Sequence, residues 1–91
     1  MTSMTPVKDE IRAFILRKYL PGESPANVRD ETPLFSSGIL DSLGSLELVA
    51  FLEQQFGIEI TAAERSLENL DRIEDIATLI TLKRDNSLRL T

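Results

Sequence analysis

Hydrophobic positions recur at helical spacing in three segments of the chain, which Pro, Gly and polar residues separate. The first segment follows Thr5, which can cap a helix, and Pro6, whose missing N–H costs nothing at the first helical position. Its positions at helical spacing are Val7, Ile11, Phe14, Ile15 and Lys18. The pattern predicts a first helix that ends at Pro21-Gly22.

A long connection follows, from Pro21 to Leu40, with three prolines, two glycines and no sustained periodicity. Connections of this length are uncommon in small domains unless they have a function. Leu34, Phe35 and Ile39 are spaced so that they can hold the connection against a helical core. We therefore expect an ordered loop.

The second helical segment is predicted to run from Ser42 to Phe56 and to end at Gly57, which suits the left-handed conformation after a helix. It has two apolar stripes. The stripe assigned to the core consists of Leu48, Phe51, Leu52 and Phe56. The second stripe is a candidate docking surface and consists of Leu43, Leu46 and Ala50, interleaved with Glu47, Glu53 and Gln54. Leu43 is expected to be exposed, whereas Leu46 suits the core and the surface equally well.

The remainder of the chain predicts two further helical elements. Ile58-Glu59-Ile60 alternates but is too short to support a sheet. Thr61 and Glu64 have the spacing of a capping box, which predicts a short third helix or turn. Asp71 is expected to cap a last helix, whose core face consists of Ile73, Ile76, Ala77 and Ile80. Residues 85–91 are expected to fray.

These elements predict an all-α fold, a small four-helix bundle with three main helices, one short helix and a long ordered loop after the first. The length of 91 residues allows one domain, with its core at about residues 5–84. There is no Cys, so helix packing must supply the stability without disulfides or thiolate metal sites. We expect no metal site.

Acidic residues are concentrated in the middle of the chain. The segment Asp30 to Glu64 has seven acidic residues and no Lys or Arg, so its charge is −7. The rest of the chain has a charge of +2, which gives the net charge of −5. Nucleic acid is therefore an unlikely partner, and basic protein surfaces are the expected ones. The N-terminal segment has no apolar stretch typical of a signal peptide, and no run is long enough to span a membrane. The expected location is cytoplasmic, without membrane insertion.

Ser42 is the hydroxyl with the most informative position, where the long loop becomes a helix. An enzyme is disfavoured because the chain has no His or Cys and no phosphate-binding Gly-rich loop. No base is close in sequence to activate Ser42, so it suits a modification site better than a nucleophile. Two simpler interpretations remain open, in which Ser42 is only a helix N-cap and the acidic run is only a solvated face.

The segment Leu34 to Val49, which reads LFSSGILDSLGSLELV, together with Phe56-Gly57-Ile58-Glu59-Ile60, resembles the acyl carrier protein superfamily. The order and size of the helices extend the resemblance over nearly the whole chain, as a single carrier domain. The resemblance implies that Ser42, flanked by Asp41 and Leu43, carries 4′-phosphopantetheine. A phosphopantetheinyl transferase would attach this group from coenzyme A through a phosphodiester. The protein would then be a non-catalytic carrier of a thioester.

Two features make the chain more similar to D-alanyl and stand-alone aminoacyl carriers than to fatty-acid carriers. Gly44 stands where fatty-acid carriers usually have an acidic residue, and the segment between Ile60 and Asp71 is longer. The expected load is an amino acid that stays in solvent. A fatty-acyl or polyketide carrier, and an unmodified acidic helical interaction module, are the alternatives.

The expected partners are the transferase, an adenylating amino acid or acyl ligase and a downstream acceptor enzyme, and the carrier is expected to be a monomer. Its predicted docking residues are Leu43, Gly44, Leu46, Glu47, Ala50, Glu53 and Gln54.

Overall fold

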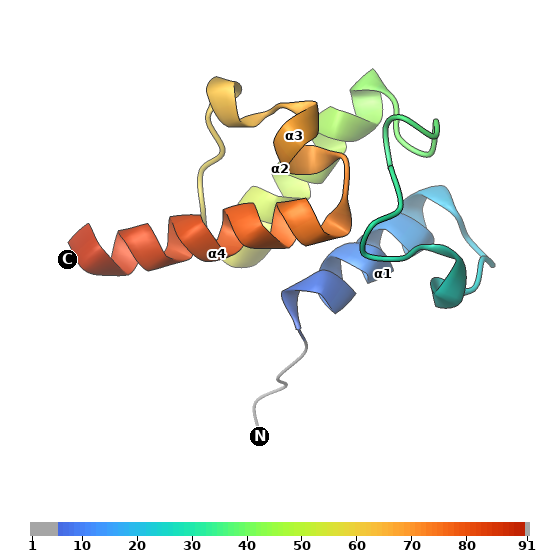
Figure 1. Cartoon of the computed structure of the whole chain (residues 1–91), viewed down its shortest axis with the longest axis horizontal. Helices are drawn as coiled ribbons and strands as arrows, with labels where there is room; N and C mark the ends of the chain where they lie inside the picture. Colours follow the sequence, from blue (N-terminus) through green and yellow to red (C-terminus); the bar gives the residue numbers. More distant parts are fainter. Residues whose placement is uncertain (1–5, 91) are drawn as a thin grey trace.

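The computed structural model describes residues 6–90, and the side chains of residues 6–84. Its elements are α1 (Val7–Tyr19), η1 (Pro25–Asn27), α2 (Ser42–Phe56), η2 (Ala62–Glu64), α3 (Leu67–Leu70) and α4 (Ile73–Leu90). Within residues 6–90 there is no strand, and α2 passes behind α4 in the view of Figure 1. The prediction of an all-α fold with three long helices and one short helix is confirmed.

The start of α1 differs from the prediction by one residue. Pro6 occupies the N-cap position with extended backbone angles (φ −60°, ψ 148°), so the first helical residue is Val7. Thr5, the predicted cap, lies outside the described residues. Acidic residues in the first turn and basic residues in the last turn complement the helix dipole; they are Asp9, Glu10, Arg17 and Lys18.

The predicted bounds of α2 are confirmed at both ends. Asp41 caps the N-terminus, and Gly57 ends the helix with φ 66°. In this left-handed conformation an L side chain would be strained, which explains why glycine ends the helix there.

The core consists of apolar side chains from all four α-helices, from the long loop and from the segment between α2 and η2. It contains Ile11, Phe14, Ile15, Val28, Leu34, Leu40, Leu48, Val49, Leu52, Ile60, Leu70, Ile73, Ile76, Ala77, Leu79 and Ile80. Leu48 and Leu52 are fully buried as predicted, whereas Phe51 and Phe56 are only partly buried. Phe51 stacks on Phe14, with ring centroids 4.1 Å apart, at the contact between α2 and α1.

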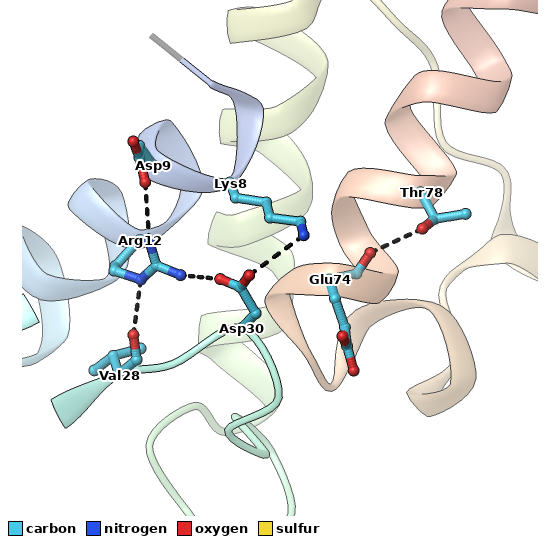
Figure 2. A network of polar contacts seen from close by, with 7 residues as sticks. All are labelled: Lys8, Asp9, Arg12, Val28, Asp30, Glu74 and Thr78. Atoms are coloured by element: carbon cyan, nitrogen blue, oxygen red, sulfur yellow. Dashed lines mark hydrogen bonds and ion pairs between the residues drawn. The ribbon is translucent and has the colours of Figure 1, made fainter. Parts of the chain in front are cut away.

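The long loop is ordered, as predicted, because residues in its middle bind the helices on both sides. Figure 2 shows Asp30 between Lys8 and Arg12 of α1, with Lys8 Nζ 3.3 Å from the Asp30 carboxylate. Arg12 Nε also donates to the carbonyl of Val28 at 2.7 Å. On the other side, the N–H of Glu74 in α4 donates to the carbonyl of Asp30 at 3.1 Å. The loop is therefore part of the folded unit.

The region between α2 and α4 confirms one prediction and corrects another. Thr61 and Glu64 form the predicted capping box, which opens η2. Asp71 does not cap α4, because its carboxylate accepts hydrogen bonds from Phe35 and Ser36 in the long loop. The first turn of α4 instead begins with the carbonyl of Arg72, which accepts from the N–H groups of residues 75 and 76.

The last helix is longer than the sequence predicted. α4 continues to Leu90, through most of the segment that was expected to fray after residue 84, and Thr91 lies outside the described residues. Within residues 6–90, none of the helices combines the length and apolar character that crossing a bilayer requires.

Candidate modification and docking site

Ser42 is the first residue of α2, and its side chain is exposed. The chain turns from the long loop into the helix at this point, so the hydroxyl lies at the rim of the bundle rather than in its core. A burial of Ser42 would have excluded its modification by another enzyme. The structure leaves it accessible.

Asp41, and not Ser42, is the N-cap of α2. Its Oδ1 accepts from the N–H of Gly44 at 2.8 Å, and its carbonyl accepts from the N–H of Ser45 at 2.9 Å. The N–H groups of Ser42 and Leu43 come before those of Gly44 and Ser45 in the helix. They are among the donors for which a helix start provides no partner within the helix. An anionic group on the Ser42 oxygen would lie at the positive end of the helix dipole, beside these donors. The simple interpretation of Ser42 as a cap is therefore wrong.

Gly44 allows Leu40 to pack closely against the first turn of α2. A methyl group at this position would lie 3.2 Å from Leu40 Cδ2 and 3.4 Å from Asp41 Oδ1. The contact with Leu40 is tight, so the end of the Leu40 side chain would have to move by a few tenths of an ångström, whereas the contact with Asp41 is an ordinary one. Gly44 itself is buried, so it offers no open surface for docking, although the sequence analysis placed it among the docking residues.

The predicted second stripe of α2 is exposed. Leu43 is 64% exposed, which confirms the prediction that it lies at the surface. Leu46, which the sequence assigned equally well to the core and to the surface, is 59% exposed. Ala50 and Gln54 are also exposed. Leu67 of α3 is 61% exposed, so α2 and α3 both present large apolar side chains to solvent.

A small cavity of about 120 Å³ lies between the loop, α2 and α3. It is lined by Phe35, Ser45, Arg65, Ser66, Leu67 and Leu70. Ser45 stands three residues after Ser42, and its Oγ donates to the Ser42 carbonyl at 2.7 Å. The cavity is therefore about one helical turn from the candidate modification site.

The two predicted docking acids of α2 also have roles within the fold. Glu47 accepts a hydrogen bond from the Tyr19 hydroxyl and lies 3.7 Å from Lys18 Nζ, which fixes the end of α1 against α2. Burial, the hydrogen bond to Glu47 and the charges of Glu47 and Asp41 raise the pKa of Tyr19, so its hydroxyl stays protonated. No local pattern in the sequence indicates these contacts, because the partners lie on different helices.

Glu53 has a comparable role at the other end of α2. Its Oε2 accepts from the N–H of Ile60 at 2.8 Å, which holds the segment after Gly57 against the helix. Both carboxylates are half-buried and engaged, whereas the apolar docking residues are open. The apolar stripe is consequently the part of the candidate docking surface that the fold leaves free.

Comparison with known proteins identifies the class to which this fold and site belong. Residues 18–80 match the family described as "Phosphopantetheine attachment site". The chain is 40% identical over 60 residues to D-alanyl carrier protein 2 of Lactiplantibacillus plantarum, covering 64% of this chain and 74% of that protein. It is 30% identical over 79 residues to the D-alanyl carrier protein of Streptococcus gordonii, and this match covers 87% of this chain and 96% of that protein.

A solved structure described as "Crystal structure of FAD-dependent dehydrogenase" contains a chain of the same fold. It has a TM-score of 0.69 and 34% identity, and the match covers 77% of this chain and 97% of that chain.

The chain therefore belongs to the phosphopantetheine attachment family, within the acyl carrier protein superfamily. It is a non-catalytic carrier that bears covalent 4′-phosphopantetheine, which supplies the thiol that this Cys-free chain lacks. The resemblance inferred from the sequence, the cofactor and the carrier role are confirmed. An exposed hydroxyl at a helix start, with free N–H donors beside it, fits a phosphodiester of this kind.

Proposed function

We propose that Ser42 is the attachment point of the phosphopantetheine arm, and that the protein carries an amino acid on this arm as a thioester between enzymes. The observation that carries the proposal is the exposed Ser42 hydroxyl at the N-terminus of α2. Asp41 occupies the cap, so the serine is free for modification and the helix start favours the phosphate.

The proposal of an aminoacyl load rests on relatives rather than on Gly44. The packing of Leu40 accounts for a glycine at this position, so Gly44 gives no information about the load. The relatives named D-alanyl carrier proteins include one that is similar over 87% of this chain. D-Alanine is therefore the first load to test, and a fatty-acyl or polyketide load is the alternative. A short polar load gains little from an apolar interior, so we expect it to stay in solvent.

We propose that partners bind through the apolar stripe Leu43, Leu46 and Ala50, with acidic residues guiding the approach. The −7 charge of residues 30–64 favours partners with a basic rim around an apolar contact. Exposed ion pairs contribute about 0–1 kcal/mol each, which suits a complex that must dissociate after each transfer.

The proposed partners are a phosphopantetheinyl transferase, an adenylating ligase and a downstream acceptor, all in the cytoplasm. The chain would meet them as a monomer and as a single carrier domain.

The similar solved structure suggests one candidate for a downstream enzyme. That structure is described as an FAD-dependent dehydrogenase, and the alignment covers 97% of the matched chain and 77% of this one. A flavin-dependent dehydrogenase that oxidises the thioester-bound load is therefore a candidate downstream enzyme. Loss of two hydrogen atoms from the loaded arm, measured by mass, would test it.

The first experiment tests the attachment site by intact mass. The purified chain is incubated with coenzyme A and a promiscuous phosphopantetheinyl transferase. We expect one pantetheine adduct on the wild type and none on Ser42→Ala. Ser24→Ala is a matched control, since Ser24 also precedes a helical turn but caps η1, and it should be modified like the wild type. An equal adduct on Ser42→Ala would refute the assignment.

The second experiment tests the load on the modified protein. A D-alanine-activating ligase should charge it, with a rate that falls as salt rises from low to high ionic strength, because salt screens the steering charges. Efficient charging by a fatty acyl synthetase, with none by an amino acid ligase, would contradict the aminoacyl load and leave the attachment site intact.

A further inference from the structure

Asp71 connects the corner between α3 and α4 to the loop that leads to Ser42. Its Oδ1 accepts from the N–H groups of Phe35 and Ser36 at 2.7 and 3.1 Å, and its Oδ2 accepts from Ser36 Oγ at 2.7 Å. Its carbonyl accepts from the N–H of Leu34 at 2.7 Å. One residue therefore holds three consecutive loop residues that are 35 or more positions away in the sequence.

The contacts continue from these loop residues to the first turn of α2. The N–H of Leu40 donates to the carbonyl of Leu34 at 2.9 Å, which closes the segment 34–40 into a compact loop. Leu40 is buried and packs against Gly44, and the next residue, Asp41, caps the helix. Because Ser42 follows directly, its position depends on this closed loop.

The second attachment of the loop lies on the same corner of the fold. The N–H of Glu74 donates to the carbonyl of Asp30, so the corner 71–74 holds the long loop at two places. Figure 2 shows this part of the loop between α1 and α4. Asp30 also has ion pairs with Lys8 and Arg12, whereas the carboxylate of Asp71 has no cation among the ion pairs of the described residues.

The carboxylate of Asp71 is held in its charged form by N–H and O–H donors. Burial raises its pKa, but the hydrogen bonds from Ser36 and from the backbone of Phe35 and Leu34 outweigh this, so the pKa lies below its usual range. An alanine at this position removes both carboxylate oxygens, so the N–H groups of Phe35 and Ser36 and the Ser36 hydroxyl lose these acceptors. An asparagine is not a suitable test, because its Oδ1 can accept from both N–H groups while its Nδ2 donates to the Ser36 hydroxyl.

We propose that Asp71 is a positioning residue for phosphopantetheine transfer, which sets the conformation of loop 34–41 and thereby presents Ser42 to the transferase. The inference rests on the proposed modification of Ser42. Without the Asp71 carboxylate, loop 34–41 would populate several conformations, only some of which fit the transferase. The apparent affinity for the transferase is then the intrinsic affinity multiplied by the fraction of carrier molecules whose loop can bind. Once bound, these molecules react at the same rate as the wild type.

The test compares transferase kinetics of the wild type with Asp71→Ala and Ser36→Ala at saturating coenzyme A. We expect Asp71→Ala to raise KM for the carrier about tenfold with kcat unchanged, as for a competent fraction of about one tenth. Ser36→Ala keeps three of the four hydrogen bonds and should raise KM less. Amide exchange should become faster at Gly38 and Leu40 in Asp71→Ala, while α2 remains protected.

Glu64→Gln is the matched control, because Glu64 also links a loop to a helix, through Thr61 and Lys83. Its KM should match that of the wild type, although its stability falls. Equal KM values for Asp71→Ala and the wild type, or an equal rise in Glu64→Gln, would overturn the inference and leave the attachment site unaffected. A wild type that gains no adduct would overturn both proposals.

Discussion

Replacing Asp41 with Ala removes the side chain that caps α2 beside the proposed modification site. The Asp41 Oδ1 accepts from the N–H of Gly44 at 2.8 Å, and Gly44 is buried. The variant therefore leaves a donor with restricted access to water, in addition to losing a favourable contact. The same change leaves the Ser42 hydroxyl in place.

The expected loss of stability follows from these two effects. Loss of an N-cap costs about 0.5–2 kcal/mol, and a buried unsatisfied donor moves the value toward the upper part of this range, about 1.5 kcal/mol. At about 4–8 °C for each kcal/mol in a domain of this size, Asp41→Ala should lower Tm by roughly 6–12 °C. Asp41→Asn should stay within about 0.5 kcal/mol of the wild type, since Asn caps helices as well as Asp.

Thermal unfolding followed by circular dichroism at the helical band measures both variants in the unmodified form. The pair separates the hydrogen bond from the charge, because Asn keeps the acceptor and loses the charge. A Tm of Asp41→Ala equal to that of the wild type would refute the capping argument. An equal loss in both variants would assign the effect to the charge at the helix dipole instead.

Two further predictions concern the core and the dependence on pH. Leu48→Ala should lower the free energy of unfolding in urea by about 2–5 kcal/mol, because Leu48 is fully buried. Leu43→Ala should lower it by about 0.5 kcal/mol or less, because Leu43 is 64% exposed. Similar losses in the two variants would contradict the assignment of Leu48 to the core face and of Leu43 to the exposed face of α2. The hydrogen bonds from Lys83 and from Thr61 lower the pKa of Glu64, so its contribution to stability is complete above the usual pKa and is lost as the pH falls through this lowered pKa. Glu64→Gln should therefore lose less stability between pH 6 and pH 3, in a comparison of urea midpoints, and a steeper loss than in the wild type would contradict this sign.

Short-range signals in the sequence were sufficient for some of the elements. The bounds of α2 and the capping box of Thr61 and Glu64 follow from residues within one turn of each other, so local chemistry determines them. The position of Ser42 after Asp41 is likewise readable without a fold, as is the exposure of Leu43 on a stripe interrupted by acidic residues. The carrier class was inferred from the same stretch.

Long-range contacts decided what these residues do. Asp71 has the sequence position of a helix cap, but its carboxylate binds Phe35 and Ser36, because folding brings the loop within hydrogen-bond distance of the corner. Gly44 suggested a subclass of carrier, whereas its burial under Leu40 gives it a packing role.

The chain by itself thus determined the bounds of α2 and which hydroxyl stands at its start, because capping and periodicity act over a few residues. Only the tertiary structure decided which docking side chains remain free, since Glu47 is engaged by Tyr19 of α1 and Glu53 by the backbone of Ile60. Such pairings depend on how segments distant in sequence pack together, and no local pattern records them.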